Sequence, residues 1–221
     1  RAAPTDSTQW QLLKRARRIV FLGNSITLHG PKADIGWTGN WGMAASSKDK
    51  DYVHLVSNAL AEHTGSQAQI MVRNIADFER NYATYDVDLE MKDLFMFDPD
   101  LVVLAIGENV PASGSEDARA QFKAGVMNIL RCAFAKRNPL VVVRSCFWAD
   151  VVKDQLLQQA CQEAGGIFVN VGPLGRDATN AARSERSFAH DGVAGHPGDK
   201  GMKAIADAIV EAVLDSHINE N

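Results

Sequence analysis

Five short runs of apolar, largely β-branched residues recur along the chain, and longer segments with helical periodicity separate them. The apolar runs are residues 19–22, 70–72, 101–106, 140–143 and 167–169. The helical segments are residues 52–63, 87–97, 116–136, 150–163 and 201–214. Strands that are apolar throughout and joined by crossover helices predict a parallel sheet with both faces covered. We therefore expect an α/β fold, a three-layer α/β/α sandwich around a five-stranded parallel sheet.

Length and composition limit the classes of protein to consider. The chain has 221 residues, of which 46% are hydrophobic, and this predicts a single domain over residues 1–221. The net charge is −4, with no block of basic residues, so neither nucleic acid nor a membrane surface is an expected partner. No apolar run approaches the roughly 18 residues that span a bilayer. A small or polysaccharide ligand fits better, and the oligomeric state stays open.

Cysteine and histidine spacing predicts neither a disulfide framework nor a metal site. The three cysteines, Cys132, Cys146 and Cys161, fall in predicted core segments and are interpreted as buried thiols. No metal or other cofactor is expected. The sequence opens with "RAAPTDST" and no methionine, so a periplasmic or secreted location after signal-peptide removal and a cytoplasmic location both remain open.

Polar residues follow the predicted strands where each one ends. Ligands of open parallel sheets bind beyond the carboxyl ends of the strands, so these residues should gather at one edge. Ser25 follows the first strand, Asn109 the third, and His196 precedes the last helix. A serine hydroxyl needs a neighbouring base to become a nucleophile, and histidine is the usual one. An asparagine amide can donate a hydrogen bond to the oxyanion that such an attack creates.

Three short blocks resemble those of the SGNH, or GDSL-type, esterases and acylhydrolases. The blocks are Gly23-Asn24-Ser25-Ile26, with Asn in place of the family's Asp, then Gly107-Glu108-Asn109, and finally His196-Pro197. Their order and their positions after the strands match the family over most of the chain. The resemblance implies a flavodoxin-like sandwich without a cofactor. It also implies that Ser25 is the nucleophile, Asn109 an oxyanion donor and His196 the general base.

Two departures from the family pattern leave alternatives open. The family's acid lies three residues before the histidine, where this chain has Val193. Asp191 is the first candidate to orient His196, Glu79 and Glu108 are substitutes, and a backbone carbonyl would do the same more weakly. The family's second block usually has a glycine whose backbone N–H joins the oxyanion hole; this chain has Glu79 at that position, and we expect its backbone N–H to donate instead. Gly42 is the alternative donor, and Arg80 is expected to hold Glu79.

Tryptophans near the predicted site suggest contact with sugar rings. Trp37 and Trp41 lie in an insertion after the serine, and Trp148 follows the fourth strand. The alternative is that Trp37 and Trp41 are core residues. With Arg80 and Glu108 at the same edge, the three tryptophans make up the predicted substrate-contacting set.

These observations favour a serine esterase that hydrolyses short acyl esters, with acetyl esters of carbohydrates as the expected substrates. The reaction would pass through an acyl-enzyme. One alternative is a carbohydrate-binding domain without catalytic activity on the same fold, which would have no need of a serine–histidine pair. A lipase-type or thioesterase-type acylhydrolase is the other.

Overall fold

The five predicted strands form one parallel sheet. The computed structural model describes residues 16–111, 114–133 and 138–215. The strands are β1 (Arg18–Gly23), β2 (Gln69–Asn74), β3 (Leu101–Ala105), β4 (Leu140–Arg144) and β5 (Ile167–Val169). Their order is β2-β1-β3-β4-β5, with β1 near the centre. Gly23 at the end of β1 pairs with Asn74 of β2 and Ala105 of β3, so the loops that follow these strands begin side by side.

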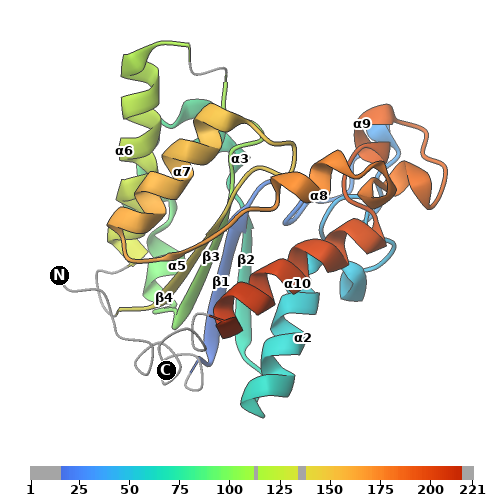
Figure 1. The fold of residues 1–221 in the computed structure, drawn as a ribbon, viewed down its shortest axis with the longest axis horizontal. Helices are drawn as coiled ribbons and strands as arrows, with labels where there is room; N and C mark the ends of the chain where they lie inside the picture. The colour runs from blue at the N-terminus through green and yellow to red at the C-terminus, as the bar shows by residue number, and fades with distance from the viewer. Residues whose placement is uncertain (1–15, 112–113, 134–137, 216–221) are drawn as a thin grey trace.

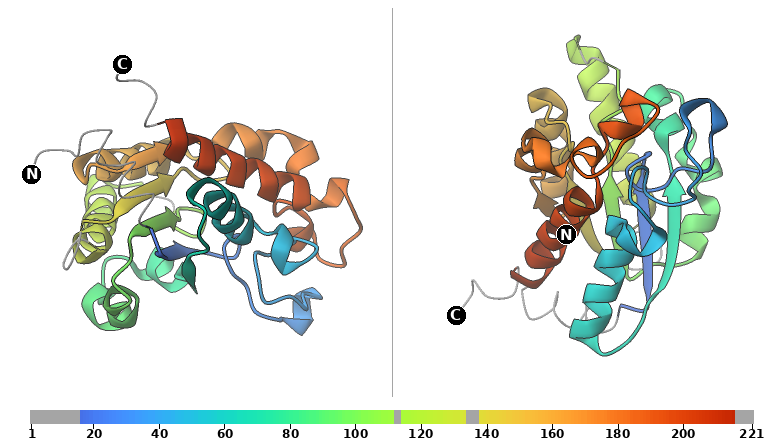
Figure 2. Two further views of the ribbon diagram at one scale, coloured as in Figure 1. Left: turned by 90° about the horizontal axis from the view of Figure 1, so that it is seen from below. Right: turned by 90° about the vertical axis from the view of Figure 1, so that its right-hand side faces the viewer.

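Successive side chains of each strand point to opposite faces of the sheet, so the hydrophobic core is divided into two clusters, one on each face. Phe21 packs with α2 (Tyr52–Thr64) and α10 (Asp199–Asp215), whereas its neighbour Leu22 packs with α6 (Glu116–Ala133) and α7 (Val151–Glu163). Successive strand side chains point to opposite faces, and here both faces are apolar because both are covered. Figures 1 and 2 show the resulting three layers. The expected α/β/α sandwich is confirmed.

Shorter helices depart from the sequence-based expectation. The single helix expected at 87–97 is two helices, α4 (Val87–Glu90) and α5 (Lys92–Met96), because the backbone leaves helical geometry at Met91. The end of the helix expected to reach residue 136 lies outside the described residues. Three helices were not expected from the sequence: α3 (Ala76–Asn81), α8 (Gly172–Arg176) and α9 (Asp191–Ala194). Short 3₁₀ turns occupy 33–35, 48–50, 178–180 and 182–184.

Two loops far apart in sequence pack together beside the carboxyl edge of the sheet. A small apolar cluster joins Trp37, Met43 and Ala44 of the first loop to Ala182 and Val193 of the second. These loops lie side by side at the right of Figure 1. Their contact forms a wall beside the end of β1.

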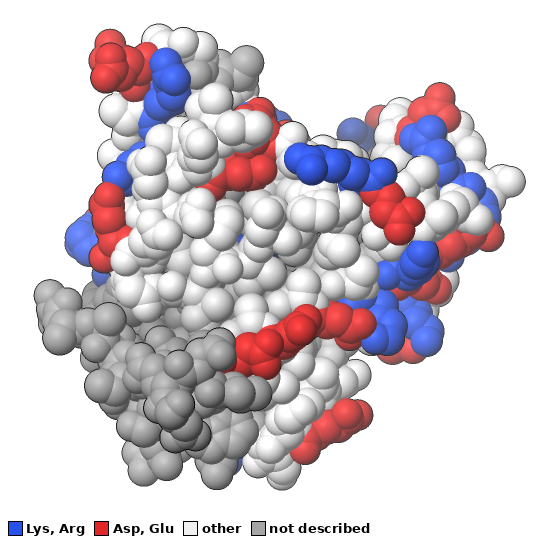
Figure 3. All heavy atoms as spheres, viewed as in Figure 1, with Lys and Arg blue, Asp and Glu red and all other residues white. Residues whose placement is uncertain are grey.

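The cysteines, the hydrophobicity of the helices and the surface charges complete the description of the fold. Cys132, Cys146 and Cys161 are buried and free, as expected. Within the described ranges, no helix combines the length and hydrophobicity needed to cross a bilayer. On the face drawn in Figure 3, acidic and basic side chains both occur around a broad uncharged centre.

Candidate active site

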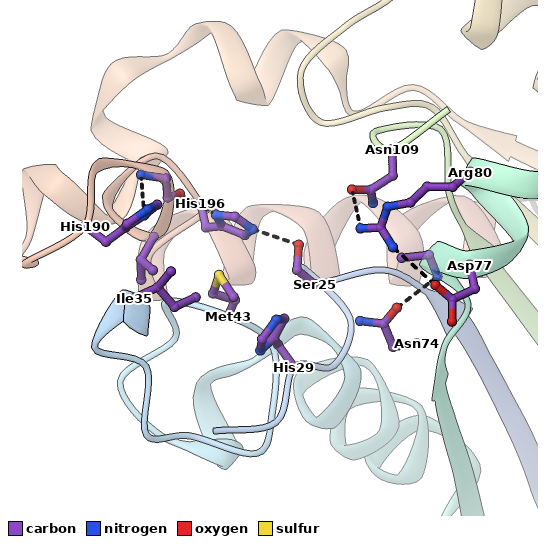
Figure 4. A pocket seen from close by; sticks show the side chains of 13 residues that line it. Ser25, His29, Ile35, Met43, Asn74, Asp77, Arg80, Asn109, His190 and His196 are labelled. Atoms are coloured by element: carbon purple, nitrogen blue, oxygen red, sulfur yellow. Dashed lines mark hydrogen bonds and ion pairs between the residues drawn. The ribbon is translucent and has the colours of Figure 1, made fainter. Parts of the chain in front are cut away.

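Ser25 and His196 meet at the carboxyl edge of the sheet. The Oγ of Ser25 lies 2.8 Å from Nε2 of His196 (Figure 4). Ser25 sits in a tight turn after β1, in which the carbonyl of Asn24 accepts hydrogen bonds from the N–H groups of Thr27 and Leu28. Gly23 is required here, because a Cβ at this position would lie 1.9 Å from Oγ1 of Thr27. The turn therefore presents the serine hydroxyl to the histidine.

A backbone carbonyl, not a carboxylate, orients the imidazole. Nδ1 of His196 lies 2.7 Å from the carbonyl oxygen of Gly192 in α9. A carbonyl only accepts hydrogen bonds, so Nδ1 carries the proton and Nε2 is free to accept the proton of Ser25. No carboxylate in the described part of the chain is hydrogen-bonded to His196. The expectation for Asp191 is corrected: it begins the short helix α9, whose turn carries the carbonyl of the next residue to the imidazole instead.

The surroundings of His196 favour its neutral form. Burial is the main cause that lowers its pKa, and the charge of His29 acts in the same direction. The hydrogen bond to Gly192 and the charge of Glu108 oppose the shift without cancelling it. The ring of Trp148 packs edge-on against the imidazole, with centroids 5.2 Å apart. A neutral imidazole is the form that can act as a base.

Asn109 presents its amide to the same site. Its Nδ2 donates to Oε2 of Glu79 at 2.8 Å, and its Oδ1 accepts from Nη2 of Arg80 at 3.4 Å (Figure 4 shows the second contact). The backbone N–H of Ser25 has no acceptor among the described residues. The site thus offers two donors near the serine hydroxyl.

Neither Glu79 nor Gly42 can donate its backbone N–H as expected. Glu79 lies in α3, where its N–H is bonded to the carbonyl of Ile75 at 3.2 Å. The N–H of Gly42 is bonded to Oδ2 of Asp51, also at 3.2 Å. The helix α3 replaces the expected loop, so the side chain of Glu79 faces inward and its backbone is occupied. Arg80 does not hold Glu79: it bonds Asn109 and Asp77.

Glu108 is a buried structural residue and does not face the cavity, contrary to its predicted role in substrate contact. Its side chain is 4% exposed and forms an ion pair with Arg144, with Oε1 and Nη1 2.6 Å apart. Oε1 also accepts from the N–H of Phe147, and Oε2 accepts from Nδ2 of Asn24. Burial opposes ionisation of Glu108, but the Arg144 guanidinium and these hydrogen bonds lower its pKa overall. Glu108 is thus an anion beneath the site.

Arg144 was not singled out from the sequence, because it ends an otherwise apolar strand. It is completely buried, and its guanidinium is the counter-ion of Glu108. A charge in this position could have been noticed as the only break in the apolar pattern of residues 140–144. A buried charge requires a partner, and Glu108 is the nearest acid that follows a neighbouring strand.

An open cavity of about 470 Å³ lies over the serine. One wall is polar and includes Asn74, Asp77, Arg80 and Asn109; the other includes Ile35, Met43 and Val193, with His29 and His190 also lining the cavity. Figure 4 shows Ser25 between these two walls. Of the predicted substrate-contacting set, only Arg80 lines this cavity. His29, Met43, Asn74 and Asp77 were not among the predicted site residues, although they belong to the same segments as Ser25 and Arg80.

Trp37 and Trp41 are packing residues. Trp37 is 7% exposed, and its Nε1 donates to the carbonyl of His29; Nε1 of Trp41 donates to the carbonyl of Ala45. Their rings pack edge-to-face, with centroids 5.8 Å apart. Each indole N–H is therefore satisfied inside the loop, and the prediction of sugar contact by these two residues is corrected. Trp148, beside His196, is 43% exposed.

Solved structures with the same fold are esterases and lipases by description. No protein-family model and no curated protein sequence matches the chain. A two-domain esterase active on acetylated mannans superposes with a TM-score of 0.62 at 17% identity, over 96% of this chain and 52% of that one. A protein from Parabacteroides merdae described as a GDSL-like lipase gives 0.60 at 18%, over 89% and 95%. An acetyl xylan esterase from Butyrivibrio proteoclasticus gives 0.52 at 13%, over 90% and 63%.

These likenesses establish the fold. The chain spans about half the length of the two-domain esterase and nearly all of the GDSL-like lipase. The flavodoxin-like sandwich expected from the three sequence blocks is therefore the fold of the chain.

Proposed function

We propose that the protein is a serine esterase that hydrolyses carboxylic esters through an acyl-enzyme. The observation that carries the proposal is the contact of Ser25 Oγ with the unprotonated Nε2 of His196, beside the amide of Asn109. A hydroxyl, a base and hydrogen-bond donors within reach of one point are what acyl transfer requires. Their location at the carboxyl edge of the parallel sheet, in an open cavity, gives an ester access to them.

Ser25, His196 and the two hydrogen-bond donors are sufficient for both acylation and deacylation. Ser25 Oγ adds to the carbonyl carbon while its proton passes to Nε2 of His196, and the oxyanion accepts from Asn109 Nδ2 and the N–H of Ser25. The imidazolium then protonates the alcohol oxygen, and the ester C–O bond breaks. Water next adds to the acyl carbon and gives its proton to Nε2, and His196 returns that proton to Ser25 Oγ as the acid leaves.

The direction of proton transfer indicates where the alcohol lies. The leaving oxygen must come within hydrogen-bond distance of His196 Nε2, so the alcohol is expected along the wall that includes Val193 and His190. The carbonyl of Gly192 holds the imidazole but brings no negative charge, so the imidazolium gains less stabilisation than beside a carboxylate. The low pKa of His196 is consistent with that environment.

The finer proposal is that the acyl group is acetyl and the alcohol a carbohydrate. Two of the structures with this fold are described as acting on acetylated mannans or as an acetyl xylan esterase. Trp148, which is 43% exposed and contacts the ring of His196, is an aromatic side chain next to the residue that would protonate the alcohol. The polar wall of the cavity, with Asn74, Arg80 and Asn109, supplies hydrogen-bond partners for the hydroxyl groups of such a substrate.

The nucleophile is tested with p-nitrophenyl acetate and the Ser25→Ala variant. We expect Ser25→Ala to lose essentially all turnover while circular dichroism and the melting temperature stay close to those of the wild type. An organophosphate should add one covalent adduct to the wild type and none to the variant, as measured by intact mass. Unchanged turnover in Ser25→Ala would refute the assignment.

The substrate class is tested by incubating the protein with acetylated mannan and acetylated xylan and measuring free acetate. Ser25-dependent release supports the carbohydrate esterase. Binding of the polysaccharide without acetate release would favour the carbohydrate-binding alternative. Turnover of p-nitrophenyl esters that rises with acyl length, without release of acetate, would favour the lipase or thioesterase alternative.

A further inference from the structure

The side chain of Glu79 is a convergence point for four N–H groups. Its Oε1 accepts from the backbone N–H of Gly107 at 2.6 Å, from the N–H of Asn109 at 3.2 Å and from Nδ2 of Asn24 at 3.2 Å. Its Oε2 accepts from Nδ2 of Asn109 at 2.8 Å. Glu79 is fully buried in α3, and all four donors belong to the loops that carry the serine and the oxyanion donor. A carboxylate that accepts from four donors is matched to its charged form.

These contacts determine which way the amide of Asn109 faces. A flipped amide would place Oδ1 against the Glu79 carboxylate and Nδ2 against the guanidinium of Arg80, so both contacts would become repulsive. In the observed orientation one hydrogen of Nδ2 points to Glu79. The second hydrogen of Nδ2 has no acceptor among the described residues, and Asn109 lines the cavity in which the oxyanion of the proposed reaction would form.

We propose that Glu79 is the positioning residue of the oxyanion hole: its carboxylate fixes the amide of Asn109 so that an N–H, not a carbonyl oxygen, faces the reacting carbonyl. This inference rests on the proposed esterase function. Glu79 touches no reacting atom and acts through Asn109. The structure also accounts for the residue type, because only an anion of this length satisfies both backbone N–H groups of the 107–109 loop together with the two side-chain amides.

Glu108 and its ion-pair partner Arg144 are the charged groups that act on Glu79. Glu108 follows β3 and repels it, and burial together with Glu108 raises the pKa of Glu79. Arg144 at the end of β4 neutralises Glu108. Asn24 lies between the two carboxylates and donates one Nδ2 hydrogen to each. The hydrogen bonds from Asn109 and Gly107 oppose the rise in pKa.

The test is a double-mutant cycle of Glu79→Gln and Asn109→Ala, assayed with p-nitrophenyl acetate. Asn109→Ala should lower kcat by on the order of 10²-fold, the loss of one oxyanion donor. Glu79→Gln turns an amide N–H₂ toward other donors and should also lower kcat, on the order of 10-fold to 10²-fold, with KM little changed. If Glu79 acts through Asn109, the double variant is no slower than Asn109→Ala alone.

The matched control is Glu211→Gln, an exposed residue of α10, which should behave as the wild type. Multiplicative losses in the double variant would overturn the proposal, because Glu79 would then act independently of Asn109. An unchanged kcat in Glu79→Gln would overturn it as well. If Glu79→Gln does not fold, the cycle is run with Glu79→Asp, which keeps the charge but withdraws it from Asn109. Absence of Ser25-dependent turnover in the wild type would instead refute the esterase function itself.

Discussion

Asn24, directly before the proposed nucleophile Ser25, shows how the residue type at one position depends on the side chains around it. The family block that this chain resembles has an aspartate here. In this chain the side chain lies between the carboxylates of Glu79 and Glu108 and donates a hydrogen to each, while its Oδ1 accepts from the N–H of Ile26. An aspartate would add a third buried carboxylate to two existing ones. The amide at this position is therefore a consequence of Glu79 and Glu108.

We predict that Asn24→Asp, which introduces the aspartate of the family block that this segment resembles, destabilises this protein. Two hydrogen bonds are lost and a buried negative charge faces two others, so stability should fall by on the order of 3 kcal/mol at pH 7. Urea denaturation measures the loss. Because protonation of the added carboxyl relieves the repulsion, the loss should shrink as the pH is lowered toward 5. A variant as stable as the wild type at pH 7 would contradict the assigned contacts.

The pKa of His196 predicts the acid limb of the activity profile. The base must be neutral, so kcat/KM falls as the pH drops through this pKa. Burial lowers the pKa of His196 below its ordinary value of about 6.5, so the fall should occur below that pH. The unfolded chain protonates His196 at a higher pH than the folded protein does. The free energy of unfolding should therefore decrease as the pH falls below about 6.5. Initial rates with p-nitrophenyl acetate between pH 4.5 and 8 provide the check, and a midpoint above 6.5 would contradict it.

At the scale of elements, the strands and long helices follow from the sequence and the short helices do not. The apolar runs predicted all five strands, since burial on both faces leaves a continuous signal. The six residues of α3, by contrast, are too few to show helical periodicity, and this caused the error over Glu79. The tryptophans of the 24–51 loop could not be assigned either, because an indole has the same sequence signal whether it faces a ligand or a core.

The packing of Trp37 leads to a prediction about that loop. Trp37→Ala removes a buried ring from the cluster that joins the loop to Val193, so stability should fall by about 3–5 kcal/mol. Trp37→Phe keeps most of the packing and serves as the matched control. Thermal melts measure the loss. At temperatures where Trp37→Ala remains folded, its KM for acetylated polysaccharide should equal that of the wild type. A KM raised several-fold at such a temperature would instead support sugar binding by Trp37.

For the whole molecule, the sequence predicted that the three proposed catalytic residues meet at one edge of the sheet, but it did not predict the groups that hold them in place. Ser25, Asn109 and His196 were placed at one edge by the rule for parallel sheets, and the structure brings them together. The group that orients His196 has no sequence signal, because every residue has a carbonyl and only the folded path of residues 190–196 selects Gly192. The buried ion pair of Glu108 and Arg144 was missed although Arg144 interrupts an apolar run, because its partner lies 36 residues away in the sequence.

Because the carbonyl of Gly192 orients His196, we predict that Asp191→Asn leaves catalysis nearly intact. Its side chain makes no hydrogen bond to His196, so kcat/KM with p-nitrophenyl acetate should change less than about tenfold, whereas loss of a true orienting carboxylate costs on the order of 10⁴-fold. A drop of the larger size would show that Asp191 reaches the imidazole during turnover.

An imidazole held by the main chain has an uncommon tolerance to change. Replacing one amino acid by another alters side chains, but every replacement still supplies a carbonyl, so no point substitution deletes this orienting atom. What can disable it is a shift in the path of α9. Substitutions that change the backbone path of α9 should therefore reduce activity more than substitutions that change only the side chains of this four-residue helix.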